Sequence, residues 1–235
     1  MEVLLDSQTD DLCVCSDELL QVYFNHVYPY APVLSETDFL KSYENGDQSV
    51  FLLQAIFANV IPYISEQLLS DLGYTDRHIA QKTFFSKAKL LYDLGCEKGQ
   101  LQILQGSIVL STMSFSYASD NDYRFWLANA VRIATQMGLH TSSLVKSVNR
   151  RSAILLRRIW WVIYNRDILL AVAGLENVRK LHDDNCDTTE LSADDWENED
   201  LPTKFQAVIQ YPSSLQKQYL IQNGKLSKLS KPLFH

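Results

Sequence analysis

The stretch NRRSAILLRRIWWVIYNRDILLAVAGL, residues 149–175, contains no proline and a single glycine, Gly174. Asn149 is a favourable N-cap residue, and a glycine commonly follows the last turn of a helix. The stretch therefore predicts one helix of about 26 residues, roughly 39 Å long at the standard rise. Its apolar residues lie almost all round the helix axis, which is typical of a helix that is buried on most sides.

Four charged residues interrupt the apolar surface of this helix, namely Arg157, Arg158, Arg166 and Asp167. They argue against a membrane span, because the longest uncharged apolar run is far below about 18 residues. Since an unpaired buried charge costs several kcal/mol, we expect these side chains to have polar partners.

The remainder of the chain also indicates helices. The 235 residues are 46% hydrophobic, enough for a sizeable core, and only 8 glycines and 6 prolines are present, which suits long helices. Apolar residues recur at helical spacing, as at Leu20, Tyr23, Phe24 and Val27, and we find no alternation with the period of two of a strand. The predicted fold is all-α, an irregular multi-helix array around a long central Arg-Arg-x-Trp-Trp helix.

Helix-capping residues and turn residues delimit the other helices. The predicted N-caps include Ser16, Ser35, Ser49 and Thr75. The predicted helices cover residues 16–28, 35–43, 49–61, a short segment ending at 72, 75–94, 101–115, 123–137, 203–211 and 213–222.

Charge and cysteine content limit the classes of partner. A net charge of −7 disfavours direct nucleic-acid binding, which needs a concentrated basic patch. Four cysteines indicate a reducing compartment, and the acidic start of the chain does not resemble a signal peptide. Residues 181–200 contain nine acidic residues and no Lys or Arg, which predicts a solvated loop.

We find no constellation of residues that predicts catalysis. The sequence has no G-x-S-x-G elbow, no Walker loop and no G-x-G-x-x-G motif. Cys13 and Cys15 are too close for the usual zinc knuckle. His182 and Cys186, at H-x3-C spacing, remain as a weak metal-binding alternative to an incidental loop. We therefore predict a non-enzyme, with no catalytic, cofactor-binding or metal-binding residues.

Trp160 and Trp161 follow two arginines directly, which leaves two interpretations. The rings could stack on a nucleic-acid base beside Arg157 and Arg158. In so apolar a helix the favoured interpretation is aromatic core packing, with the arginines paired to the acidic loop. We expect Asp183, Asp184 or Asp187 to supply that pairing, or Asp167 through a neighbouring turn.

Three stretches resemble the middle homology region of fungal binuclear-zinc-cluster transcription factors. They are LLQVYFNHVYPYAPVLSETDFL at 19–40, RFWLANAVRIATQMGLHTS at 124–142, and RRIWWVIYNRDILLAVAG followed by the acidic DDNCD. The resemblance spans about residues 16–190, and the order of the stretches is that of the family. The motif positions are Arg157, Arg158, Trp160, Trp161, Tyr164, Asp167, Gly174, Asp183, Asp184 and Asp187.

The sequence departs from the family pattern at two points. The family usually has Gly-Arg-Pro after the central helix, where this chain has Gly174, Leu175 and Glu176. The family's six-cysteine DNA-binding module is absent from these 235 residues, so no zinc or other cofactor is expected in this chain. The expected organisation is a mobile N-terminal lead (1–15), the regulatory domain that the resemblance implies, incomplete here (16–200), and a helical remnant with a basic tail (201–235).

The resemblance implies a regulatory or interaction domain of a fungal transcription regulator. Such a domain acts in the nucleus in control of RNA polymerase II transcription, through the transcription machinery or the rest of the regulator. Direct DNA binding by this chain and a membrane location are not expected. The alternatives are a small-metabolite sensor in which Arg157 or Arg158 meets an acidic effector, a helical protein-interaction scaffold, and an enzyme whose site is not recognisable.

The predicted central helix needs apolar neighbours on nearly every side. The helices before it can cover one side, whereas the acidic loop after it buries little. We therefore expect an incomplete folding unit with an exposed apolar face. The alternative is that the predicted helices between Thr203 and Gln222 fold back and close that face.

Overall fold

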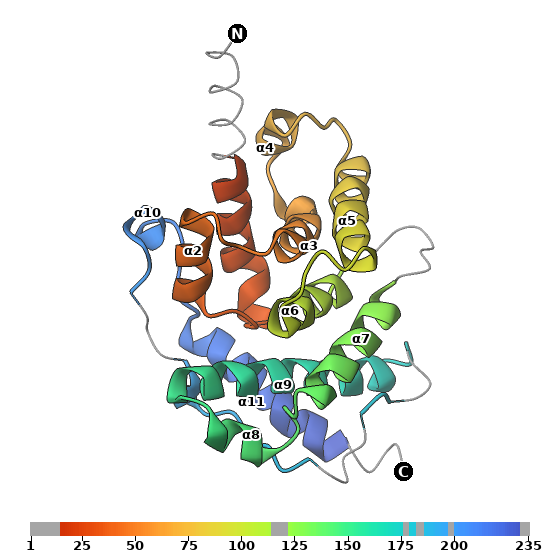
Figure 1. Cartoon of the computed structure of the whole chain (residues 1–235), viewed down its shortest axis with the longest axis vertical. Helices are drawn as coiled ribbons and strands as arrows, with labels where there is room; N and C mark the ends of the chain where they lie inside the picture. The colour runs from red at the N-terminus through yellow and green to blue at the C-terminus, as the bar shows by residue number, and fades with distance from the viewer. Residues whose placement is uncertain (1–14, 114–121, 176–178, 182–185, 197–199, 231–235) are drawn as a thin grey trace.

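The computed structural model describes residues 15–113, 122–175, 179–181, 186–196 and 200–230. Helices and turns, with no strand, form the described part of the chain, which confirms the predicted all-α class (Figure 1). A helical segment at 15–22 is followed by η1 (Tyr23–Val27), η2 (Tyr28–Tyr30), α2 (Glu36–Glu44), α3 (Val50–Val60), η3 (Ile61–Tyr63), α4 (Glu66–Asp71), α5 (Arg77–Asp93), α6 (Gln100–Ser111), α7 (Tyr123–Gln136), α8 (Ser142–Ser147), α9 (Arg150–Val172), η5 (Ala193–Asp195), α10 (Thr203–Gln206) and α11 (Ser214–Ser230).

Helix α9 lies across the middle of the molecule, with α2 to α6 on one side of it (Figure 1). It also contacts α7, α8, η5 and α11. Asn149 caps it as predicted, since the side-chain oxygen accepts a hydrogen bond from the amide of Ser152 at 2.9 Å. Gly174 follows its last turn with a φ of 69°, a conformation that glycine adopts without strain. Most of its apolar side chains are buried, as the all-round pattern predicts.

The N-terminal half packs α3 between α5 and α6, and α6 in turn packs against α7. The close approach of α3 and α6 depends on Gly106, because a Cβ atom there would lie 2.3 Å from the ring of Phe51. Phe51, Tyr92 and Trp126 form an aromatic cluster with ring centroids 5.1–6.3 Å apart. These contacts join helices distant in sequence into the core that supports α9.

Several helix ends follow the predicted capping residues and others do not. Ser35 and Ser49 cap α2 and α3 through side-chain oxygens that accept amide hydrogens three residues on. Cys15 and Ser16 are already helical, so Ser16 is not the cap of this helix. Asp76, one residue after the predicted Thr75, caps α5 because its carboxylate accepts from the amide of His78. Helix α8 was not predicted.

The segment after residue 200 folds back onto α9, which was the alternative to an exposed apolar face. Helix α11 contacts α9 and runs to Ser230, beyond the predicted end at Gln222. Its Gly224 lies against the Trp161 ring, where a Cβ atom would be 3.4 Å away, an ordinary van der Waals distance. Buried side chains in this segment are Leu201, Phe205, Ile209, Leu220 and Ile221.

The closure of α9 is not complete. Ile163 and Ile168 are fully buried, whereas Val172 is 51% exposed. Of the side chains expected to close the face, Val208 and Tyr219 are 36% and 46% exposed. The same hydrophobic core includes residues on both sides of the predicted boundary at residue 200. None of the helices described is long and apolar enough to cross a membrane.

Candidate functional site

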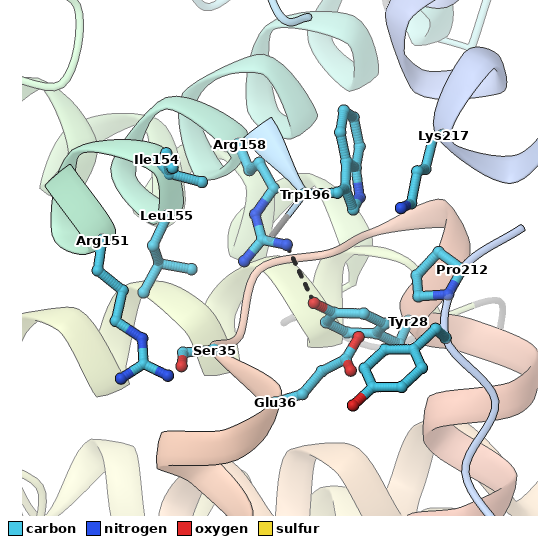
Figure 2. A pocket seen from close by; sticks show the side chains of 11 residues that line it. Tyr28, Ser35, Glu36, Arg151, Ile154, Leu155, Arg158, Trp196, Pro212 and Lys217 are labelled. Carbon is cyan, nitrogen blue, oxygen red and sulfur yellow. Dashed lines mark hydrogen bonds between the residues drawn. The ribbon is translucent and has the colours of Figure 1, made fainter. Parts of the chain in front are cut away.

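Arg158 is buried under the N-terminal segment rather than beside an acidic loop. Its two terminal nitrogens donate to the hydroxyl of Tyr28 at 3.2 Å and to the carbonyl oxygen of Leu34 at 3.0 Å. The Tyr28 hydroxyl donates to the same carbonyl at 3.1 Å, which closes a three-membered network. Figure 2 shows the bond between Arg158 and Tyr28. Neither Asp187 nor Asp167 is thus the partner of Arg158, whereas the predicted pairing with Asp183 or Asp184 falls on residues outside the described ranges. Tyr28 in η2 and Arg158 in α9 are 130 residues apart in sequence, so the spacing of apolar residues within helices could not predict their contact.

The environment of Tyr28 keeps its hydroxyl protonated. Burial raises the pKa of Tyr28 well above its usual value of 10.0, although the charge of Arg158 lowers it in part. The carboxyl group of Glu36, which lies beside the Tyr28 ring, raises this pKa further (Figure 2). The hydroxyl therefore donates one hydrogen bond and accepts another within the network.

Arg157 does pair with the acidic segment, but through a residue other than those expected. Its guanidinium donates to Asp195 at 2.7 Å, and Asp195 is 2% exposed. Asp195 lies in η5 and also accepts from the amide of Ser192 at 2.8 Å. Asp187 instead accepts hydrogen bonds from the amide and hydroxyl of Ser142, at 2.6 and 2.7 Å. Asp183 and Asp184 lie outside the described residues.

The indole rings of Trp160 and Trp161 are each 1% exposed and therefore inaccessible for stacking on a nucleic-acid base. The Trp161 indole nitrogen donates to the carbonyl oxygen of Thr189 at 2.8 Å. The Lys228 ammonium lies 5.2 Å from the centre of the Trp161 ring, so α11 covers it from outside. Tyr164 packs edge-on against Trp161 at 5.2 Å between ring centroids. These motif side chains hold the acidic segment and α11 against α9.

Asp167 fixes the chain that returns after α9. Its carboxylate accepts from the amides of Lys180 and Leu181, at 2.8 and 3.1 Å, and lies 3.5 Å from the Arg179 guanidinium. Burial raises the pKa of Asp167 above 3.8, while these hydrogen bonds and Arg179 act in the opposite direction. Arg179 also lies over the Tyr164 ring at 5.5 Å.

The three motif stretches meet through long-range hydrogen bonds. The first and third meet at Tyr28, Leu34 and Arg158. The second stretch joins the acidic segment, because the carbonyl oxygen of Leu139 accepts from Thr188 at 2.8 Å and that of His140 accepts from the Asp187 amide at 3.1 Å. The three stretches that resemble the family therefore contribute hydrogen bonds that hold the interior of the domain together.

Among the cavities that α9 lines, two have arginines of this helix in their walls. The first, beside Arg158, Arg151, Lys217 and Glu36, has a volume of about 30 Å³, room for a water molecule or two (Figure 2). The second has a volume of about 360 Å³ and is lined by η1, η2, α9 and α11, with Arg166 on its wall. A volume of that size falls at the lower end of the range of ligand pockets. Arg166 stood out in the sequence as a charge in an apolar helix but is not one of the motif positions.

No group of three or more metal-ligating side chains is gathered within the described ranges. Cys186 is half-buried, whereas His182 and Cys13 lie outside those ranges, so the weak metal alternative is untested. Cys15 is buried.

Comparison with known proteins gives the class of this domain. The model of the family described as the fungal specific transcription factor domain matches residues 20–235. The chain is 37% identical over 213 residues to the fusaric acid cluster transcription factor FUB12 of Gibberella fujikuroi, covering 91% of this chain and 32% of that protein. It is 32% identical over 189 residues to cutinase transcription factor 1 beta of Fusarium vanettenii, covering 77% and 21%. It is 30% identical over 207 residues to the acetamidase regulatory protein of Aspergillus fumigatus, covering 83% and 25%.

The matching family and these relatives are all described as transcription factors. The chain belongs to the fungal-specific transcription factor domain family, which confirms the resemblance seen in its sequence. The chain spans about a third of the length of the first curated relatives it matches. No solved structure matches it.

Proposed function

We propose that this chain is the regulatory and interaction domain of a fungal transcription regulator that acts in the nucleus on RNA polymerase II transcription. The observation that carries the proposal is the 37% identity to a transcription factor over 91% of the chain. In this proposal the domain acts through contacts with the transcription machinery or the remainder of the regulator. It needs no cofactor of its own, and any zinc belongs to a six-cysteine module that these residues lack.

The arrangement of α9 supports such a role. The N-terminal segment, the acidic segment and α11 are all held on this one helix by hydrogen bonds or ring contacts. A contact made on one of these segments therefore acts on a core that the others share.

A tethering experiment tests the proposal. The chain is fused to a heterologous zinc-free DNA-binding domain, and expression of a reporter gene carrying its operator is measured in yeast. We expect the fusion to change reporter expression relative to the DNA-binding domain alone, in activation or in repression. Equal expression from both, with the fusion intact and nuclear by microscopy, contradicts the proposal.

The same proposal predicts that the chain alone binds no DNA selectively. A mobility-shift titration at physiological salt should show no sequence-selective complex at submicromolar protein, since the net charge of −7 opposes phosphate binding. Selective binding under those conditions would show that the chain reads DNA itself.

A further inference from the structure

We propose that the cavity between η2, α9 and α11 binds a small aromatic carboxylic acid whose carboxylate pairs with Arg166. This inference goes beyond the transcriptional role, and binding can be measured whether or not that role holds.

The cavity has the size and the apolar walls of a ligand site. Its volume is about 360 Å³, within the lower part of the range for small-molecule pockets. Helix α9 contributes one wall, while η1, η2, the end of α3, η3 and α11 contribute the others. The apolar lining residues are Val27, Ala31, Val162, Leu169, Leu170 and Leu220.

Arg166 supplies a positive charge that nothing else in the lining balances. One terminal nitrogen of its guanidinium donates to the carbonyl oxygen of Ser111, and its Nε has no hydrogen-bond partner among the described residues. The lining residues of the cavity include no aspartate or glutamate. The neighbouring Asp167 is engaged with the chain at Lys180 and Leu181.

This guanidinium is charged under ordinary conditions. Burial lowers the pKa of Arg166 to about 10, which leaves it protonated at neutral pH. Arg166 has no carboxylate partner among the described residues, and a partly buried cation in that state is costly, so a ligand carboxylate would supply charge-assisted hydrogen bonds. The other two arginines of the original sensor hypothesis are already engaged, Arg157 with Asp195 and Arg158 with Tyr28 and Leu34.

Aromatic side chains at the edge of the cavity favour a flat ligand. Tyr63 stacks on His26 with an interplanar angle of 4° and ring centroids 5.9 Å apart. Tyr30 meets Tyr219 edge-on at 5.4 Å. The three tyrosines are 46–58% exposed, so their rings are available to pack against a bound aromatic ring.

One further polar group narrows the class of ligand that we expect. The side-chain oxygen of Asn165, which lines the same cavity, is buried and has no hydrogen-bond donor among the described residues. A ligand that carries a hydroxyl or ring N–H besides its carboxylate would satisfy this acceptor. The preferred class is therefore an aromatic monocarboxylate with one additional donor.

Calorimetric titration of the purified full chain tests the proposal with 3-hydroxybenzoate, 6-hydroxy-2-naphthoate and the two corresponding uncharged amides. We expect at least one acid to bind about tenfold or more tightly than its amide, the difference made by one charge-assisted hydrogen bond. Arg166→Met should abolish that preference, whereas Arg132→Met on the exposed face of α7 should leave it unchanged.

A second variant covers the case in which Arg166→Met fails to fold. Leu169→Trp fills the cavity and leaves Arg166 in place, and it should weaken binding of both acids. Three results would each overturn the proposal. The acids and amides could bind equally well, neither acid could bind at millimolar concentration, or folded Arg166→Met could bind the acids as tightly as the wild type.

Discussion

Replacing Tyr28 by phenylalanine removes one hydroxyl group from the buried network of Arg158 and changes little else in volume. The Arg158 guanidinium then loses one of its two hydrogen-bond acceptors, while the carbonyl oxygen of Leu34 keeps the bond from Arg158. The loss destabilises the fold because the Arg158 guanidinium, which is 8% exposed, cannot replace the lost hydrogen bond with one to bulk water.

The expected loss follows from the type of bond. A hydrogen bond to a charged group contributes about 1.5–3 kcal/mol, so we expect Tyr28→Phe to lower the free energy of unfolding by about 2 kcal/mol. For a domain of this size that corresponds to a fall in Tm of roughly 4–8 °C.

A double-mutant cycle with Arg158→Met isolates the part of this loss that depends on the charge of Arg158. In that variant no cation needs the hydroxyl, and Tyr28 donates only a neutral hydrogen bond to Leu34. Tyr28→Phe should then cost about 1 kcal/mol. Urea unfolding of the four proteins, followed by circular dichroism, gives the coupling energy, which we expect to be about 1 kcal/mol.

Additive effects would refute this reasoning. If the two substitutions add within about 0.5 kcal/mol, the hydroxyl and the guanidinium do not stabilise each other. Tyr30→Phe is the matched control, because Tyr30 lies in the same turn with 58% of its surface exposed. Its effect should stay within about 0.5 kcal/mol.

Three further predictions concern the segments attached to α9. Asp195→Ala removes the partner of Arg157 and should lower the free energy of unfolding by about 3 kcal/mol, whereas Ala at the exposed Asp194 should leave the melting temperature unchanged. Trp161→Phe loses the hydrogen bond to the chain at residue 189, so hydrogen exchange by mass spectrometry should accelerate at residues 186–196; unchanged exchange would contradict it. Burial raises the pKa of Asp167, so the folded state binds this proton more tightly than the unfolded state. The stability of the wild type relative to Asp167→Asn should therefore rise as the pH is lowered toward 3.8, the usual pKa of this carboxyl group, and a flat or opposite trend would contradict the assignment.

Helices and their ends were the features that local sequence could predict. Asn149, Ser35 and Ser49 cap helices because a short polar side chain reaches amides only two or three residues away. The all-round apolar pattern of residues 150–172 was sufficient to predict a buried central helix. Local preference did not indicate that α11 continues through Gly224, where contacts with α9 outweigh the intrinsic cost of glycine in a helix.

The need for polar partners at the charges of α9 followed from sequence, but their identity did not. A buried guanidinium accepts any oxygen that the fold places within reach, and for Arg158 those oxygens belong to residues 124 and 130 positions away. The composition of the acidic segment indicated a carboxylate for Arg157, yet only the turn at η5 selects Asp195 among nine acidic residues.

The cavity was the least predictable feature. Its walls come from six separate elements, and no local pattern records that His26, Asn59, Arg166 and Tyr219 surround one space. The sequence by itself determined the helical class, the central helix and the family. Only the tertiary structure decided which oxygens meet the buried arginines and where space remains between helices, because both depend on contacts between residues far apart in the chain.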